Sequence, residues 1–168
     1  MKYEVIENVL DDFEDLQNLW CNSSNISWFY NKSTLDIESD NNFMFTHHLY
    51  RNDQITSNFF NTIQELTYKV SILSGKSKLL RIKANMYTNQ GKTIYHAKHT
   101  DYEDIGDFKT AVFNFTTCNG GTILYLDDEE INIPSVENTL LIFDGNILHS
   151  GYTQTDTHNR VLINFDFF

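Results

Sequence analysis

The spacing of hydrophobic and polar positions changes near residue 77. Before this point, apolar residues recur at three- and four-residue steps in two segments, which is the spacing of one helix face. We therefore predict amphipathic helices over 11–21 and 52–74, with Asn52 or Asp53 as candidate caps and Gly75 as the stop of the second. The segment 28–49 has no clear period and is predicted to be irregular. The apolar positions are Phe13, Leu16, Leu19 and Trp20 in the first helix, and Ile55, Phe59, Ile63, Leu66, Val70 and Leu73 in the second.

After residue 77 the period becomes two, which is the spacing of a half-buried strand. Many short strands with regular turns favour a sandwich or jelly roll. We therefore predict one domain over 1–168, mainly β with N-terminal helices (α+β), in which 1–77 is a helical support region and 78–168 is the stranded core. The predicted strands are 78–88, 93–98, 109–117, 122–127, 130–133, 139–143 and 160–168, with turns at 89–91, 119–121 and 144–146.

The last predicted strand has two different faces. One face is wholly apolar, and we expect it to pack against the N-terminal helices. The other face begins with Arg160 and would point into the barrel, where an arginine without an anion is costly. A guanidinium is a planar fork that suits a carboxylate, although a surface arginine on a frayed terminal strand remains the alternative. The apolar face carries Val161, Ile163, Phe165 and Phe167; the other carries Arg160, Leu162, Asn164 and Asp166.

The strand predicted at 78–88 is divided in the same way. Leu80, Ile82, Ala84 and Met86 form its apolar face, opposite Arg81, Lys83, Asn85 and Tyr87. The polar face is interpreted either as part of a site inside the barrel or as a solvated edge.

Three residues have the composition of a two-histidine, one-carboxylate metal site. His99 and Asp101 are two apart, so on a strand both side chains point to the same side and can reach one metal. His149 follows an apolar run and a turn, at the edge of a predicted strand. Imidazole and carboxylate suit Fe(II), whereas Cys21 and Cys118 lack the spacing of a structural zinc site. A chance His-x-Asp triplet is the alternative interpretation.

A longer run of short motifs carries a resemblance to a known family. Over about residues 78 to 168 the chain resembles the Fe(II)/2-oxoglutarate-dependent dioxygenases, and within them the prolyl-4-hydroxylase-like branch. The motifs, in the family's order, are Asn85-Met86-Tyr87, Gly91, His99-Thr100-Asp101, Asn119-Gly120-Gly121-Thr122, Phe143-Asp144, His149-Ser150-Gly151 and Arg160.

The resemblance implies a double-stranded β-helix with Fe(II) held by His99, Asp101 and His149. It further implies that Arg160 binds the distal carboxylate of 2-oxoglutarate, with O2 as the second co-substrate and ascorbate as a possible additive. Further candidates near 2-oxoglutarate are Asn85, Tyr87, Thr110 and Asn164, and candidates for substrate contact are His96 and Tyr102.

The activity implied is hydroxylation of an unactivated C–H bond, with release of succinate and CO2. A protein or peptide side chain is the favoured substrate, and a free small molecule is the next. Members of the branch commonly have a glycine shortly before the basic residue, whereas 156–159 here reads Asp-Thr-His-Asn, which puts the substrate in doubt. A non-catalytic jelly-roll module and a cupin-like metalloenzyme without 2-oxoglutarate stay open, although the latter leaves Arg160 unexplained.

Composition adds expectations about partners and location. Twelve basic and 23 acidic residues give a net charge of −11, which disfavours a nucleic-acid-binding surface. No signal peptide or membrane span is predicted, and two unpaired cysteines fit a reducing cytoplasm. The abundance of asparagine is typical of AT-rich genomes such as those of phages, in which case the location is the host cytoplasm. The oligomeric state is left open.

Overall fold

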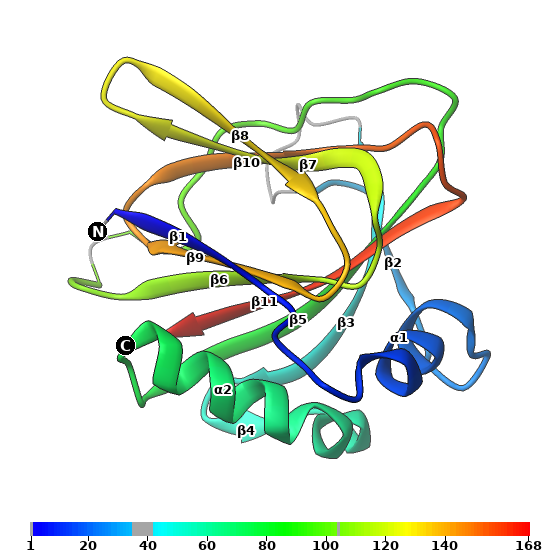
Figure 1. Cartoon of the computed structure of the whole chain (residues 1–168), viewed down its shortest axis with the longest axis horizontal. Helices are drawn as coiled ribbons and strands as arrows, with labels where there is room; N and C mark the ends of the chain where they lie inside the picture. Colours follow the sequence, from blue (N-terminus) through cyan, green and yellow to red (C-terminus); the bar gives the residue numbers. More distant parts are fainter. Residues whose placement is uncertain (1, 35–41, 104) are drawn as a thin grey trace.

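Two antiparallel sheets face each other in the computed structural model, which describes residues 2–34, 42–103 and 105–168 (Figure 1). In spatial order the larger sheet contains β1 (Tyr3–Glu7), β9 (Thr139–Asp144), β6 (Lys109–Asn114), β11 (Asn159–Phe167), β5 (Leu79–Thr88), β3 (Met44–Arg51) and β2 (Phe29–Asn31), and β4 (Gln54–Ile55) pairs with β3. The smaller sheet has the order β10 (Leu148–Tyr152), β7 (Cys118–Leu126) and β8 (Glu129–Ser135). This arrangement confirms the predicted jelly-roll architecture.

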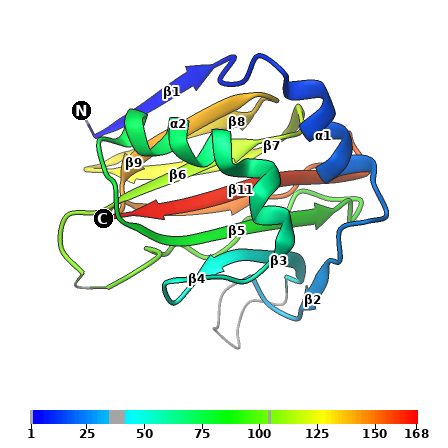
Figure 2. The ribbon, with the colours of Figure 1, turned by 90° about the horizontal axis from the view of Figure 1, so that it is seen from below.

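Two helices cover the outer face of the larger sheet, α1 (Phe13–Asn22) and α2 (Gln64–Ser74), the latter preceded by a 3-10 turn at Asn58–Ile63 (Figure 2). The apolar face of β11 packs beneath them, as its alternation predicts: Val161, Ile163, Phe165 and Phe167 share one buried cluster with residues of both helices. No helix in the described ranges is long and apolar enough to cross a membrane.

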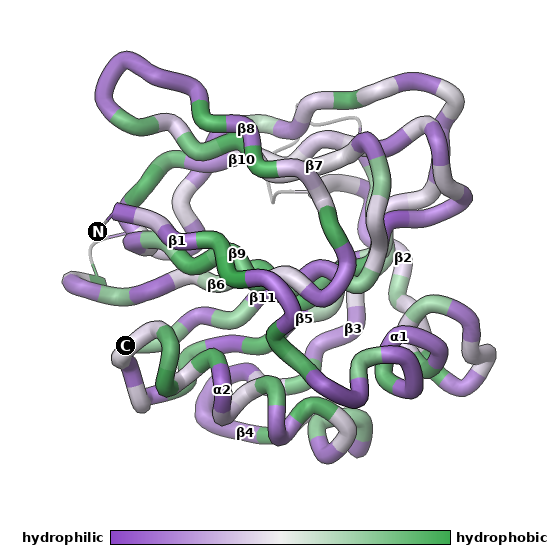
Figure 3. Tube along the Cα trace, in the orientation of Figure 1, coloured by the Kyte–Doolittle hydropathy of each residue, from purple (hydrophilic) through white to green (hydrophobic). Residues whose placement is uncertain are grey.

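A second, smaller apolar cluster lies between the two sheets. It joins Leu124 of β7 to Leu141 and Phe143 of β9 and to Leu162 of β11. Figure 3 shows hydrophobic residues gathered where β1, β9 and β6 run together. The two clusters fix both faces of β5, β6, β9 and β11, so these strands form a rigid support for side chains that point between the sheets.

The N-terminal region differs from its prediction as a helical support. It contributes β1, β2, β3 and β4, and the segment predicted to be irregular contains β2 and most of β3. Residues 35–41 of that segment lie outside the described residues. The alternation of β3 escaped detection because His47 takes a buried position, with its ring nitrogens 2.7 Å from the Ser27 carbonyl oxygen and 2.7 Å from the Ser57 hydroxyl.

The second predicted helix begins later than expected. Asn52 and Asp53 do not cap it; they form the turn between β3 and β4, with φ of 53° and 58°. Ser57 caps the 3-10 turn instead, accepting a hydrogen bond from the Phe59 amide. The predicted stop at Gly75 is confirmed, since Gly75 has φ of 68° and its amide donates to the Ile72 carbonyl.

Two predictions in the C-terminal half are wrong. The segment 93–98 forms no strand, although an isolated bridge pairs its Tyr95 with Tyr152 of β10. The predicted turn at 119–121 lies inside β7. The remaining predicted strands are present within a few residues, and β10 is an additional short strand that carries His149.

Candidate metal centre

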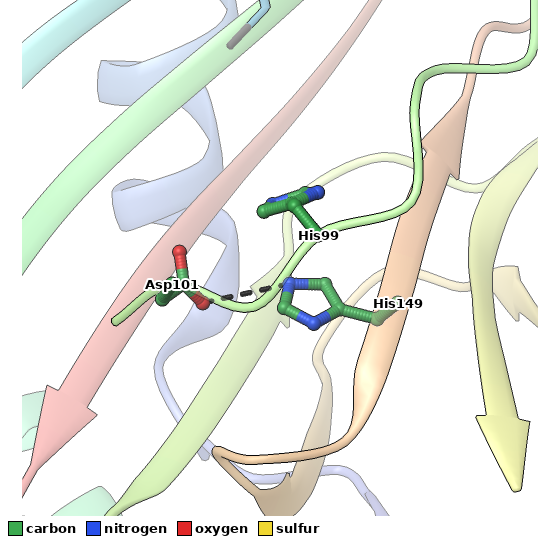
Figure 4. A group of neighbouring side chains, drawn as sticks. All are labelled: His99, Asp101 and His149. Atoms are coloured by element: carbon green, nitrogen blue, oxygen red, sulfur yellow. Dashed lines mark ion pairs between the residues drawn. The ribbon is translucent and has the colours of Figure 1, made fainter. Parts of the chain in front are cut away.

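The structure brings His99, Asp101 and His149 together between the two sheets. Their ligand atoms all lie within 4.8 Å of one another, and Figure 4 shows the three side chains converging on one point. His149 comes from β10, whereas His99 and Asp101 come from the loop between β5 and β6. The predicted proximity therefore holds, but the premise that His99 and Asp101 share a strand is wrong.

The two histidines are joined through their backbones. The amide of each donates to the carbonyl of the other, at 2.9 Å in both directions, which forms an isolated antiparallel bridge. Directly opposed residues in such a pair have neighbouring side chains, and the two imidazole centroids are 4.4 Å apart. The bridge thus takes the place of a continuous strand in aligning the histidines.

Each imidazole is oriented by a carbonyl of its own segment. Nδ1 of His99 lies 3.2 Å from the Ala97 oxygen, and Nδ1 of His149 lies 3.1 Å from the Ile147 oxygen. A proton on Nδ1 satisfies these contacts and leaves both Nε2 atoms as donors to a metal, the usual orientation of metal-binding histidines. Burial, and then the neighbouring His149, lowers the pKa of His99 to about 4, so this ring stays neutral.

The two oxygens of Asp101 have different neighbours. Oδ2 lies 3.5 Å from Nε2 of His149 and 3.3 Å from the Thr110 hydroxyl. Oδ1 accepts a hydrogen bond from Nη2 of Arg81. Burial raises the pKa of Asp101, but the His149 contact and the Arg81 charge outweigh it and hold the pKa well below its usual range. Asp101 is therefore a carboxylate, the form that binds a metal.

Arg81 is shared with a second buried acid. Its Nε donates to Oδ2 of Asp166 at 2.8 Å, and the Thr110 hydroxyl lies 3.1 Å from Oδ1 of Asp166. Burial and repulsion by Asp101 raise the pKa of Asp166 to about 7, against the lowering effect of Arg81. Arg81, Asp166 and Thr110 thus form a hydrogen-bonded support behind the carboxylate of Asp101.

A cavity of about 520 Å³ opens beside the three candidate ligands. It contains most of the predicted co-substrate and substrate residues. Thr110 is the exception, because it is fully buried and contacts Asp101 and Asp166 instead of the cavity. The predicted residues that line the cavity are Asn85, Tyr87, His96, His99, Asp101, Tyr102, His149, Arg160 and Asn164.

Arg160 lies in this cavity with only neutral groups around it. It is 1% exposed, and Nη1 donates to the carbonyl oxygens of Gly121 at 2.9 Å and Tyr152 at 3.3 Å. Nε has no hydrogen-bond partner, and within the described ranges no carboxylate pairs with the guanidinium. Burial lowers its pKa. An uncompensated buried cation with an unused N–H is suited to an anionic ligand.

The Gly120-Gly121 pair makes room for this arginine. A Cβ on Gly120 would lie 3.2 Å from Cδ of Arg160, and one on Gly121 would lie 2.5 Å from both the Tyr152 hydroxyl and the Ile133 carbonyl oxygen. The glycines predicted as a turn therefore serve a different purpose: they let strand β7 approach Arg160 and Tyr152 closely.

Sequence reasoning missed Arg81, Asp166 and His48 as parts of the site. Period-two alternation does place Arg81 and Asp166 on the inward faces of their strands, so this signal was present. His48 of β3 lines the cavity, but its strand was not predicted.

Comparison with known proteins identifies the fold. No family model and no curated protein matches the sequence. Among solved structures, a Burkholderia pseudomallei oxidoreductase of the 2OG-Fe(II) oxygenase family aligns with a TM-score of 0.74 at 11% identity, over 99% of this chain and 85% of that one. A prolyl hydroxylase from Trichoplax adhaerens, in complex with a peptide fragment of the hypoxia inducible factor oxygen degradation domain, aligns with a TM-score of 0.70 at 14% identity, over 99% and 83%.

A third similar structure is the epimerase SnoN in complex with Fe3+, alpha ketoglutarate and nogalamycin RO. It has a TM-score of 0.62 at 14% identity, over 99% of this chain and 78% of that one. The chain therefore has the double-stranded β-helix fold found in the 2-oxoglutarate- and Fe(II)-dependent oxygenases.

Proposed function

We propose that this protein is an Fe(II)- and 2-oxoglutarate-dependent dioxygenase that hydroxylates an unactivated C–H bond. Arg160 carries this proposal, because it is a buried cation with no described counter-charge in the cavity that His99, Asp101 and His149 line. A metal site alone would fit many enzymes. A metal site that shares a cavity with an unpaired guanidinium fits a metal-chelating acid with a second, distal carboxylate.

The donor set fits Fe(II). Two Nε2 atoms with fixed Nδ1 contacts and one ionised carboxylate form a facial triad, the set that leaves open positions on a non-haem iron. Bound there, iron would supply the activation of O2 and the oxidation of a C–H bond. The residues of the chain would hold the iron, orient 2-oxoglutarate and shield the site. Arg160 would bind the far carboxylate of 2-oxoglutarate, while the two sheets would exclude bulk water.

We propose a protein or peptide side chain as the substrate, with a small molecule as the alternative. Of the similar structures, one is a prolyl hydroxylase with a bound peptide, whereas SnoN is described with nogalamycin RO. A cupin-like enzyme that does not use 2-oxoglutarate would leave the buried charge of Arg160 without a purpose. The free Cys21 and Cys118 agree with a reducing compartment such as the cytoplasm.

The first experiment does not need the substrate. Fe(II) and 2-oxoglutarate are added to the protein without oxygen, and the visible charge-transfer band of the chelate is recorded for wild type, Asp101→Ala and Arg160→Ala. We expect a band in wild type, none in Asp101→Ala, and weaker 2-oxoglutarate binding with Fe(II) binding kept in Arg160→Ala. Lys92→Ala removes an exposed charge and serves as the control. Fe(II) binding without any band would overturn the proposal, and equal 2-oxoglutarate affinity in Arg160→Ala would remove the role of Arg160.

A further inference from the structure

The cavity has a second cationic region, separate from Arg160. It is formed by His48 and Arg51 of β3 and by Arg81 and Lys83 of β5, and all four line the cavity. We call these four residues the cationic wall. Asp101 is the only carboxylate among the described residues that line the cavity, in a chain of net charge −11.

A β-bulge builds this wall. The pairing of β3 with β5 shifts between His48 and Tyr50, so that His48 opposes Lys83 and Arg51 opposes Arg81. Leu49, which has no partner in the register, and Tyr50, which follows it, both pack into the apolar cluster beneath the helices. Arg51 consequently returns to the cavity side, three residues after His48 instead of two. Bulges of this kind re-aim side chains beside functional sites.

One cross-strand pair of this wall brings two like charges together. Like charges directly opposite each other across strands destabilise a sheet, and Arg51 faces Arg81 in this way. Arg81 is engaged by Asp101 and Asp166, whereas Arg51 has no hydrogen bond or ion pair with any described residue. Lys83 adds a third cation, in the neighbouring cross-strand pair with His48.

The positive electrostatic potential of the wall affects the pKa of His48. Burial, and then the charges of Lys83, Arg51 and Arg81, lowers its pKa to about 4. The imidazole is therefore neutral near pH 7, and its Nδ1 is buried without a hydrogen-bond partner. A neutral imidazole with an unused nitrogen between cations can donate a hydrogen bond to an anion.

We propose that the cationic wall binds an anionic group of the substrate, a carboxylate or a phosphate, through Arg51 and Lys83 with His48 beside them. This inference rests on the proposed function and deepens it, because it names the charge class of the substrate. Arg160 would hold 2-oxoglutarate on the other side of the cavity, against β7 and β10. The cationic wall lies on β3 and β5, so the anionic group of the substrate and the distal carboxylate of 2-oxoglutarate would each bind to different cations. A favoured substrate is thus an acidic or phosphorylated peptide side chain, or a side chain beside one.

Binding of small probes tests the wall without a known substrate. The protein is loaded with Zn(II), which does not turn over, and titrated with the N-acetyl N-methylamides of L-aspartate and L-asparagine and with inorganic phosphate. The two amides have nearly the same shape, but only the aspartate side chain is charged. Chemical shifts of the backbone amides of β3 and β5 report binding, with and without saturating 2-oxoglutarate. Binding of 2-oxoglutarate itself, measured separately by calorimetry, tests the proposed function and not the wall.

We expect the aspartate probe to bind about 10-fold more tightly than the asparagine probe, as charge-assisted hydrogen bonds exceed neutral ones by that order. Arg51→Gln should remove most of this preference, and Lys92→Gln, the same loss of charge at an exposed site outside the cavity, should keep it. Phosphate binding tighter than aspartate binding would identify a phosphorylated substrate. Equal binding of the two amides, a preference that survives Arg51→Gln, or no binding of any probe would each overturn the inference.

Discussion

Arg81 and Asp101 form an ion pair that occupies only one oxygen of the carboxylate. Oδ1 meets Arg81, while Oδ2 faces Nε2 of His149 at 3.5 Å. The carboxylate is thereby turned so that a single oxygen points toward the two histidines. Asp166 pairs with Arg81 at 2.8 Å, so the orientation of a candidate metal ligand depends on a residue outside the group of three.

Substituting Asp166→Asn should weaken metal binding. Without the second carboxylate, Arg81 pairs with Asp101 alone and competes more strongly with the metal for it. We expect a loss of affinity of about 10- to 100-fold, the usual effect of removing an outer-shell partner. Titration with Co(II) measures this. Asn164→Ala lies on the same strand face and is the control; equal affinities for wild type and Asp166→Asn would contradict the supporting role.

Relative to Asp166→Asn, the metal-free wild-type protein should lose stability as the pH rises from about 4 to about 7. His48 and His99, with pKa values of about 4, act in the opposite direction, but they do so in both proteins. The folded pKa of Asp166 is about 7, raised by burial and by Asp101, whereas an unfolded aspartate titrates near 4. In this window the folded state keeps a proton that the unfolded state has lost, so raising the pH favours unfolding. Urea unfolding of wild type and Asp166→Asn across this pH range measures the change in the free energy of unfolding. The asparagine mimics the protonated acid, and a slope of the same size in both proteins would refute this origin.

The pKa of His48 should be measurable by NMR at about 4. Arg51→Gln removes one of the cations that lower it, so the pKa should move upward. Lys92→Gln is the matched control, because it removes the same charge at an exposed position that is not among the main causes of the His48 shift in pKa. A His48 pKa near 6.5 in wild type would contradict both the burial of this ring and the effect of the three cations on it.

Substituting Gly121→Ala should destabilise the fold by about 1–3 kcal/mol, the cost of forcing extra volume into a packed site. The added Cβ would lie 2.5 Å from the Ile133 carbonyl oxygen, which is backbone and cannot rotate away. Gly120→Ala meets its nearest atom at 3.0 Å and should cost less. Chemical denaturation gives both values, and the reverse order would disagree with the close packing of β7 against β8.

Docking of α2 on the sheet should depend on Leu66. This side chain is 1% exposed, and Leu66→Ala should lower the free energy of unfolding by about 2–5 kcal/mol, since it leaves a cavity in the core. Tyr68 is 68% exposed on the same helix, so Tyr68→Ala should change the free energy of unfolding by less than about 0.5 kcal/mol. Equal effects in thermal or urea unfolding would argue against the helix orientation.

The parts of the fold that the sequence predicts are those where burial follows a simple period. Strand β11 alternates between the helix-covered face and the cavity, and that alternation correctly places Phe165 in the core and Arg160 in the cavity. Strand β3 is different, because a bulge breaks its period and a buried histidine interrupts its apolar face. Neither feature has a signature in a single sequence.

The three residues of the candidate metal site were predicted more fully than the residues that hydrogen-bond to them. Residue types alone suggest a metal for His99, Asp101 and His149, although the loop that carries the first two is not a strand. The shared use of Arg81 by Asp101 and Asp166 could not be predicted, because it joins positions 20 and 85 residues away from Arg81 along the chain. Such contacts depend on which strands become neighbours, and this follows from the packing of the whole molecule.

The bridge between His99 and His149 gives a bound metal a mechanical role as well as a chemical one. The loop before β6 is fastened to β10 by this bridge and by that between Tyr95 and Tyr152. A metal held by both imidazoles would close a ring of about 50 residues and act as a reversible cross-link, worth ~4 kcal/mol if it restricts the unfolded chain as a disulfide of that span does. Loss of the metal would then loosen this edge of the barrel, so that a metal-free protein is also a more easily unfolded and more easily proteolysed one.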